Sequence, residues 1–265
     1  MAFERVLGQE HAARLFGGVL RTGRLAHAYL FLGPSGVGKA LFAKELAKAV
    51  LCHNPQPDAC DACDACRKFD HGRHADFHLV QPAQGKRFVS IDDIKGLQRA
   101  IAVKAVERGH KAFLIDDADA MTAQAANAFL KTLEEPPPQS LLILVAASLE
   151  PMLDTIVSRC QLVRFRPLAP EVISHALVQQ HDVPEQEAAA VASFAGGSLG
   201  RACAMLEGQA DELRRWIVTK RWVHLAVIIA VVISEAALIK GFLEASVILV
   251  CTVVLAFVVE GRKGV

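Results

Sequence analysis

The feature that most constrains this chain is the run Gly33-Pro34-Ser35-Gly36-Val37-Gly38-Lys39, which lies between an apolar stretch, 25–32, and a helical pattern. Glycines in this spacing let backbone N–H groups turn inward around phosphate oxygens, and the lysine adds a positive charge. A strand before the run and a helix after it are the context that such a loop requires. We therefore predict a phosphate-binding loop, with nucleotide-binding residues Gly33, Gly36, Gly38 and Lys39.

Two positions near this loop depart from the usual chemistry of nucleotide hydrolysis. Ala40 stands where a Ser or Thr usually holds Mg²⁺, so one metal ligand is missing. Asp116 follows the apolar run 112–115 and is placed to reach that Mg²⁺. The next position usually carries a glutamate that polarises the attacking water, and Asp117 is shorter by one methylene, about 1.5 Å. The sequence thus predicts weakened binding of ATP and Mg²⁺ and a degenerate catalytic position at Asp117.

The expected strands alternate with helical stretches, which is the pattern of a parallel α/β sheet. The strands are expected at 25–32, 112–115 and 141–146. A helix is expected from Thr122 to Leu133, because three prolines follow it closely. Residues 168–206 have a helical pattern without a strand, which predicts a small helical domain.

Four of the seven cysteines, Cys52, Cys60, Cys63 and Cys66, fall within fifteen residues. An odd number of cysteines, without a signal peptide, favours a reducing compartment over a disulfide framework. Two-residue gaps let neighbouring sulfurs converge on one tetrahedral ion, and Zn²⁺ suits an all-sulfur structural site. An iron–sulfur cluster and free thiols are the alternatives. We expect the nearby histidines to be solvated loop residues: His53, His71, His74 and His78.

The order of these motifs resembles the clamp-loader subunits of bacterial DNA polymerase III, which are of the AAA+ class. The resemblance rests on the phosphate loop, the four-cysteine insert, Leu114-Ile115-Asp116-Asp117, the run from Asn127 to Pro137, and Ser158-Arg159-Cys160-Gln161. It covers about residues 1–206. It implies an AAA+ P-loop NTPase-like parallel sheet with a zinc-module insert, followed by a small helical lid domain.

Within this family, the resemblance favours the delta-prime type, a catalytically weak stator, over the gamma/tau motors that hydrolyse ATP. Ala40 and Asp117 support this assignment. Motors usually carry a sensing arginine at the position of Gly200, whereas here Arg201 comes one residue later. By the resemblance, we expect Arg201, with Ala40 and Asp116, to belong to the nucleotide-binding residues. Ala147 falls where the first polar sensor would be.

By the same resemblance, Arg159 is an arginine finger that acts in trans, on ATP bound in the neighbouring subunit. A guanidinium is permanently charged and binds phosphate through two hydrogen bonds. The alternative is an ion pair with a carboxylate of the same chain.

The function that the resemblance implies is loading of the sliding clamp onto primed DNA, in a cytoplasmic hetero-oligomeric ring with gamma/tau and delta subunits. The formal net charge is +1, which excludes a globally basic nucleic-acid binder but not a local basic surface. DNA contact would be mainly with backbone phosphate. Lys95, Arg99 and Lys104 are expected on one helix, with a solvated face as the favoured interpretation.

The C-terminal part departs from the family. Of the 38 residues from 222 to 259, 30 are apolar, and they carry the excess in the mean hydropathy of +0.30. Two segments of 18 residues, Trp222–Ile239 and Phe242–Val259, flank Lys240-Gly241. Each is just long enough to cross a bilayer core as a helix, about 27 Å. A membrane hairpin, a truncated or frame-shifted collar domain, and buried helices of an assembly interface are the three interpretations.

We therefore predict three parts. They are an AAA+ nucleotide-binding-like domain over 1–167 with its zinc module at 52–66, a lid over 168–206, and a divergent helical segment over 207–265. Besides the stator, two other functions fit: an active gamma/tau-type ATPase motor, and a membrane-tethered nucleotide-binding regulator that reuses the fold.

Overall fold

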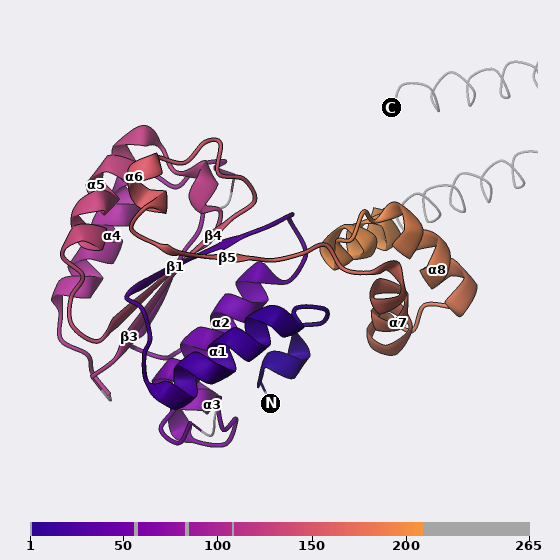
Figure 1. Ribbon diagram of the computed structural model, residues 1–265, viewed down its shortest axis with the longest axis horizontal. Helices are drawn as coiled ribbons and strands as arrows, with labels where there is room; N and C mark the ends of the chain where they lie inside the picture. Colours follow the sequence, from indigo (N-terminus) through magenta and orange to yellow (C-terminus); the bar gives the residue numbers. More distant parts are fainter. Residues whose placement is uncertain (1, 56–57, 83–84, 108, 209–265) are drawn as a thin grey trace, which may run out of the picture. The chain divides into compact units, whose positions relative to one another are not determined.

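A computed structural model describes residues 2–55, 58–82, 85–107 and 109–208 of the chain. A sheet of five parallel strands forms its centre, in the order β2-β3-β4-β1-β5 (Figure 1). The strands are β1 (Ala28–Leu32), β2 (Phe77–Val80), β3 (Lys111–Ile115), β4 (Ser140–Ala146) and β5 (Gln161–Arg164). The strands β1, β3 and β4 confirm the three apolar runs that the sequence predicts as strands.

Helices cover both faces of the sheet, so the α/β layers predicted from the sequence are present (Figure 1). One face packs against α1 (Glu10–Thr22) and α2 (Lys39–Leu51), around a cluster that includes Phe16, Phe31 and Phe42. The other packs against α4 (Ile91–Ala102), α5 (Ala123–Glu134) and α6 (Asp154–Val157), around Phe113 and Phe129. These five phenylalanines are fully buried, and burial of large apolar side chains is the main stabilising contribution to such a core.

The shorter elements connect these layers. They are the 3-10 helices η1 (Ala2–Arg5) and η2 (Ala118–Ala120), and α3 (Asp64–Asp70) in the cysteine-rich insert. The segment expected to be helical without a strand holds α7 (Pro170–His181), α8 (Glu185–Phe194) and a further helix, Leu199–Gly208.

The register of the parallel strands brings the functional motifs to one edge of the sheet. Leu32 at the end of β1 pairs with Ala146 of β4 on one side and Arg164 of β5 on the other. The phosphate loop follows β1, the two aspartates follow β3, and Ala147 follows β4. Ligands of open parallel sheets bind at this carboxyl edge, especially where the strand order reverses.

The structure corrects one detail of the expected basic helix. Lys95 and Arg99 lie on α4, but Lys104 lies beyond its end at Ala102, so the three cations do not share one helix. Val103 caps this end with extended backbone, and Lys111 donates hydrogen bonds to the carbonyls of Ala100 and Val103 there.

None of the helices in the described part of the chain combines the length and the apolarity that a membrane span requires. The pair Glu185–Phe194 and Leu199–Gly208 reaches that length and apolarity together, with a bend of 116° between the two. The hairpin expected at 222–259, and the segment 207–265 apart from its first two residues, lie outside the described part of the chain.

Candidate functional site

The phosphate loop has the backbone geometry that its glycines predict. Gly36 and Gly38 have φ of +75° and +97°, which residues with a side chain rarely adopt. Gly38 is the N-cap of α2, and Lys39 is the first residue of that helix. Gly33 serves a different purpose, because a Cβ there would lie 2.4 Å from the carbonyl oxygen of Phe165 in the chain leaving β5.

Lys39 is directed toward its own loop. Its ammonium donates hydrogen bonds to the carbonyl oxygens of Gly33, at 2.6 Å, and Pro34, at 2.7 Å. Burial lowers the pKa of Lys39, while the nearby carboxylates of Asp119, Asp116 and Asp117 oppose that shift. To bind a phosphate in the usual way, the ammonium would have to leave these carbonyls.

Three carboxylates lie on the chain that follows β3. Asp117 adopts a left-handed conformation, φ +52°, at the start of η2. Burial raises the pKa of Asp117, and the charges of Asp116 and Asp119 raise it further. Asp119 was not predicted as a site residue. Its carboxylate accepts hydrogen bonds from the backbone N–H of Ala147, at 2.9 Å, and of Ser148, at 3.1 Å. The acidic run Asp116-Asp117-Ala118-Asp119 was the available signal, but it does not reveal this partner.

The start of the Leu199–Gly208 helix and the preceding Ser198 pack directly on the phosphate loop. The backbone N–H of Gly200 donates to the carbonyl of Gly36 at 3.1 Å. A Cβ at Gly36 would lie 2.3 Å from the hydroxyl of Ser198, and one at Gly200 would lie 3.0 Å from the Cα of Gly36. A side chain at Gly200, where the resemblance places the sensing arginine of motors, would therefore require the loop backbone to shift by a few tenths of an ångström.

A cavity of about 330 Å³ lies between the loop and the carboxylates, at the lower end of the range for small-molecule sites. Most of the predicted nucleotide-binding residues line it: Gly36, Gly38, Lys39, Ala40 and Asp116. Asp117, predicted as the degenerate catalytic position, lines it as well. Gly33 and Arg201 do not line this cavity, and the side chain of Arg201 is exposed. Ala40 offers no oxygen, so a Mg²⁺ ion in this cavity would depend on Asp116 and on the nucleotide itself.

Arg159 lies away from this cavity, just after α6, and it is paired within the chain. Its Nη2 donates to Glu134 Oε1 at 2.8 Å, and its Nη1 donates to the carbonyl of Thr155 at 2.9 Å. The side chain of Arg159 is 36% exposed and that of Glu134 is 48% exposed. An exposed ion pair of this kind contributes at most about 1 kcal/mol, so it does not exclude other partners for the guanidinium.

The four clustered cysteines form a group that could hold a metal ion. The Sγ atoms of Cys52, Cys60, Cys63 and Cys66 all lie within 4.8 Å of one another. Backbone N–H groups of Asn54 and Cys60 donate to the Sγ of Cys52, each at 3.3 Å. Although burial opposes it, hydrogen bonds from the backbone N–H groups of Cys66 and His53 lower the pKa of Cys63 to about 6. Four converging sulfurs that accept such hydrogen bonds fit the donor set of a structural zinc site.

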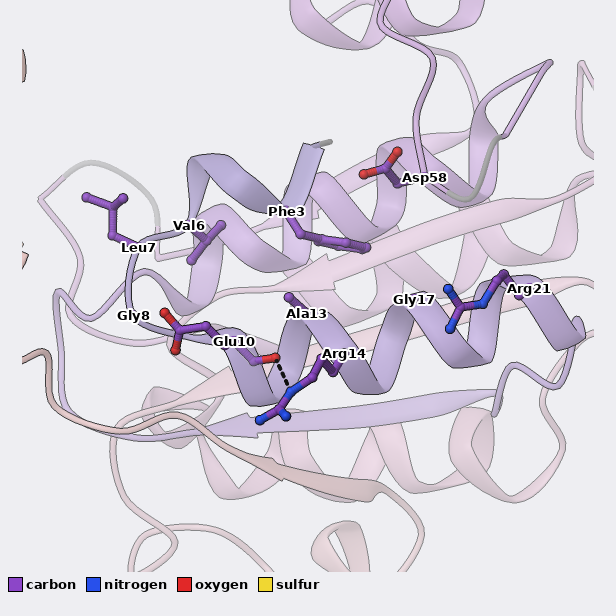
Figure 2. A pocket seen from close by; sticks show the side chains of 10 residues that line it. All are labelled: Phe3, Val6, Leu7, Gly8, Glu10, Ala13, Arg14, Gly17, Arg21 and Asp58. Atoms are coloured by element: carbon purple, nitrogen blue, oxygen red, sulfur yellow. Dashed lines mark hydrogen bonds between the residues drawn. The ribbon is translucent and has the colours of Figure 1, made fainter.

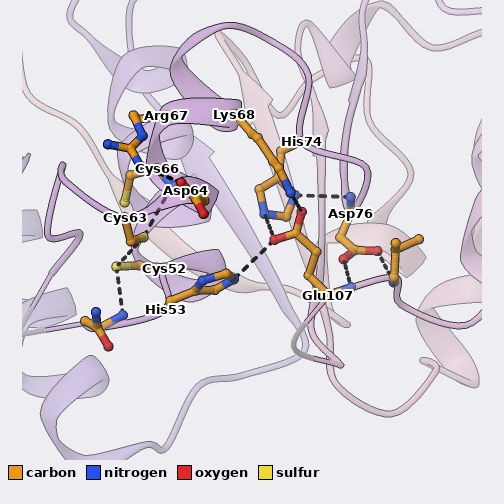
Figure 3. A network of polar contacts seen from close by, with 12 residues as sticks. Cys52, His53, Cys63, Asp64, Cys66, Arg67, Lys68, His74, Asp76 and Glu107 are labelled. Atoms are coloured by element: carbon orange, nitrogen blue, oxygen red, sulfur yellow. Dashed lines mark hydrogen bonds and ion pairs between the residues drawn. The ribbon is translucent and has the colours of Figure 1, made fainter.

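A polar network ties this insert to the loop before β3 (Figure 3). Glu107 accepts from Lys68 at 2.7 Å, and its other oxygen lies 3.1 Å from His53 Nε2. His74 lies beside it, with Nε2 at 3.7 Å from Glu107, and it is 6% exposed. The expectation that His74 is solvated is wrong, because its side chain is buried beside Glu107, and burial lowers its pKa. His78 lies on β2 and stacks on Phe113, so it is not a loop residue either.

A second cavity, of about 680 Å³, lies along α1 (Figure 2). It is lined by apolar residues such as Phe3 and Val6, by Gly17, and by Arg14, which donates to the carbonyl of Glu10 at 3.4 Å. It shares no lining residue with the phosphate-loop cavity. It brings together none of the residues that the sequence singles out for chemistry.

Comparison with known proteins agrees with this arrangement. Residues 8–169 match the family model of the DNA polymerase III delta subunit. The DNA polymerase III subunit delta' of Bacillus subtilis is 37% identical over 176 residues, which are 66% of this chain and 53% of that protein. The subunit tau of the same organism is 33% identical over 211 residues, which are 77% of this chain and 37% of that protein. The chain thus spans about half, or less, of the length of these relatives.

A solved structure is similar in fold. The RuvB Holliday junction branch migration motor of Thermotoga maritima has a TM-score of 0.55, with 14% sequence identity, over 80% of this chain and 65% of that chain. This similarity supports the AAA+ fold predicted from the sequence.

Proposed function

Because the chain belongs to the DNA polymerase III delta subunit family, we propose that it is a delta-prime-type stator in a clamp loader. In this role it assembles with gamma/tau and delta subunits in the cytoplasm and helps to place the sliding clamp on primed DNA. It contacts the DNA through backbone phosphate, without reading sequence. Residues 1–167 form the AAA+ domain of this subunit and 168–206 form its lid.

The observation that carries the stator proposal is the state of the phosphate loop. Gly200 packs on Gly36, where a side chain would require the backbone to shift, and Ala40 lacks the oxygen that usually holds Mg²⁺. Each feature weakens binding of ATP and Mg²⁺ by Gly36, Gly38, Lys39 and Asp116, and the short Asp117 weakens hydrolysis. ATP would be at most a weak ligand here.

We assign two further roles from the residues. Arg159 reaches the γ-phosphate of ATP in the neighbouring subunit, where a trans arginine accelerates hydrolysis by about 10³–10⁵. Its position after a short helix, with a third of its side chain exposed, supports this role. The four cysteines hold one Zn²⁺, which stabilises an insert that has only a small apolar cluster of its own.

The alternative is an active gamma/tau-type motor, which the similarity to the subunit tau of Bacillus subtilis favours. In that case, the purified chain alone would hydrolyse ATP and DNA would stimulate it.

Co-purification tests assembly. The full chain, used as bait, should recover tau- and delta-type subunits and the sliding clamp from an extract of its own organism. Recovery of none of them, with the chain found in the membrane fraction, would instead support a membrane-tethered regulator and contradict the proposed function.

A further inference from the structure

Arg159, the residue that we propose as the trans arginine, is held by two contacts within its own chain. Its Nη2 donates to the carboxylate of Glu134 at 2.8 Å, and its Nη1 donates to the carbonyl of Thr155 at 2.9 Å. Thr155 belongs to α6 and Glu134 to α5, which lie side by side (Figure 1). The guanidinium is therefore fixed to two helices at once while a third of the side chain stays exposed.

Glu134 occupies a position that helix electrostatics disfavours. It is the last residue of α5, where unpaired carbonyl groups already give a partial negative charge. A carboxylate at a helix C-terminus is destabilising unless a cation neutralises it. Among the described residues, the cation that pairs with Glu134 is Arg159. A residue whose charge is unfavourable for its own helix, but which has a specific partner elsewhere in the fold, often serves a functional role.

We propose that Glu134 is a positioning residue for Arg159, an inference that rests on the proposed function. A free arginine side chain populates many rotamers, and reaching a phosphate in a neighbouring subunit would remove that freedom. The ion pair with Glu134 and the hydrogen bond to Thr155 remove part of it beforehand, which lowers the entropic cost of the contact. The pair is half-exposed and therefore weak, so it orients the guanidinium without preventing its approach to phosphate.

Glu135 offers a matched control. It is the next residue, it is the C-cap of the same helix, and it has the same charge. Within the described residues it has no ion pair, and its side chain is exposed. Glu135→Gln therefore removes the same charge from the same helix end and leaves Arg159 paired.

The test measures ATP hydrolysis by a tau-type subunit with and without the full-length chain. The difference between the two rates is the part that depends on this chain. Glu134→Gln should lower kcat of this part about fivefold and leave KM unchanged, because positioning acts on the reacting phosphate rather than on ATP binding. Glu134→Asp should recover part of the loss, and Glu135→Gln should match the wild type. In an Arg159→Ala background, Glu134→Gln should have no further effect.

Two outcomes would overturn the inference. In the first, Arg159→Ala removes the ATP hydrolysis that depends on the added chain, but Glu134→Gln gives the same kcat as Glu135→Gln or a higher one. Glu134 then does not position Arg159, and the proposed function still stands. If Arg159→Ala leaves the rate unchanged, the trans role of Arg159 is wrong and the inference is wrong with it. Thermal unfolding of the variants within a few degrees of the wild type, as expected for exposed side chains, separates these outcomes from misfolding.

Discussion

At the scale of single residues, two glycines in helices have opposite surroundings. Gly200 lies in the helix Leu199–Gly208, where a Cβ would come within 3.0 Å of the Cα of Gly36. Gly17 lies inside α1, where a Cβ would meet no atom within 4 Å. A helix with glycine in its interior is less stable than the same helix with alanine by about 0.5–1 kcal/mol. At Gly200 the close contact of a Cβ with Gly36 would cost more than alanine gains.

We predict opposite signs for the two alanine substitutions. Gly17→Ala should raise the free energy of unfolding by about 0.5–1 kcal/mol. Gly200→Ala should lower it by about 1 kcal/mol, because the backbone of the phosphate loop cannot yield easily. Urea unfolding of both variants measures this difference. Stabilisation by Gly200→Ala would mean that the helix does not pack on the loop in solution.

The residues that sequence reasoning could identify are those with a fixed spacing. Lys39 follows the loop glycines, and Asp116 follows an apolar strand, so their places are predictable from the chain alone. Asp119 and Glu134 were missed as site residues because their partners, the N–H of Ala147 and the guanidinium of Arg159, are more than twenty residues away. Such pairings depend on the tertiary fold.

At the scale of elements, central strands were predictable and edge strands were not. β1 and β3 are buried along their whole length and appear in the sequence as unbroken apolar runs. β2 and β5 lie at the two edges of the sheet, with only one buried residue each. Their mixed composition, Phe-His-Leu-Val and Gln-Leu-Val-Arg, shows no period that separates a strand from a loop.

The N-terminus of α4 depends on one carboxylate. Asp93 accepts hydrogen bonds from the backbone N–H of Ser90, at 2.8 Å, and from its hydroxyl, at 2.6 Å, and the Ser90 oxygen caps the helix in return. These hydrogen bonds lower the pKa of Asp93. Because the pKa of Asp93 is lower in the folded state than in the unfolded state, its charge stabilises the fold at pH above the unfolded-state pKa, about 3.9. This stabilisation is lost as the pH falls through the folded-state pKa.

Asp93→Asn should therefore lower the free energy of unfolding by about 0.5–1 kcal/mol at pH 7. This difference from the wild type should shrink as pH falls below about 4. Denaturant unfolding across that pH range measures it. Asp92→Asn is the control, because it removes the same charge from the same turn and Asp92 has no hydrogen-bonded partner in the part of the chain that the structure describes. A constant difference at all pH values would contradict the capping role of the charge.

The cysteine-rich insert should be the element that depends on metal. We expect elemental analysis to find one zinc ion per chain. The Cys66→Ser variant should lose this zinc, whereas Cys203→Ser should keep it, because Cys203 lies outside the cluster. A chelator should increase amide hydrogen exchange in residues 52–70 and leave β1, β3 and β4 protected, because those strands have their own core. Iron in the purified protein, or unchanged exchange after chelation, would contradict a structural zinc site.

At the scale of the whole molecule, the family match agrees with the resemblance seen in the sequence, and the proposed function depends on other chains. The chain matches its relatives over about half of their length or less. Ala40 offers no oxygen to Mg²⁺, Gly200 packs on Gly36, and Arg159 lies at a different place with about a third of its side chain exposed. The proposed function makes one central claim: this chain supplies an arginine to the ATP of a neighbouring subunit and hydrolyses little ATP at its own loop.

ATP hydrolysis by the reconstituted assembly tests this claim most directly, by comparing two substitutions in this chain. Arg159→Ala should lower the rate that depends on this chain by at least about tenfold, whereas Lys39→Ala should leave it within about twofold. The chain alone should hydrolyse ATP no faster than background. The reverse result, with loss of activity in Lys39→Ala and none in Arg159→Ala, would contradict the account and indicate an active motor.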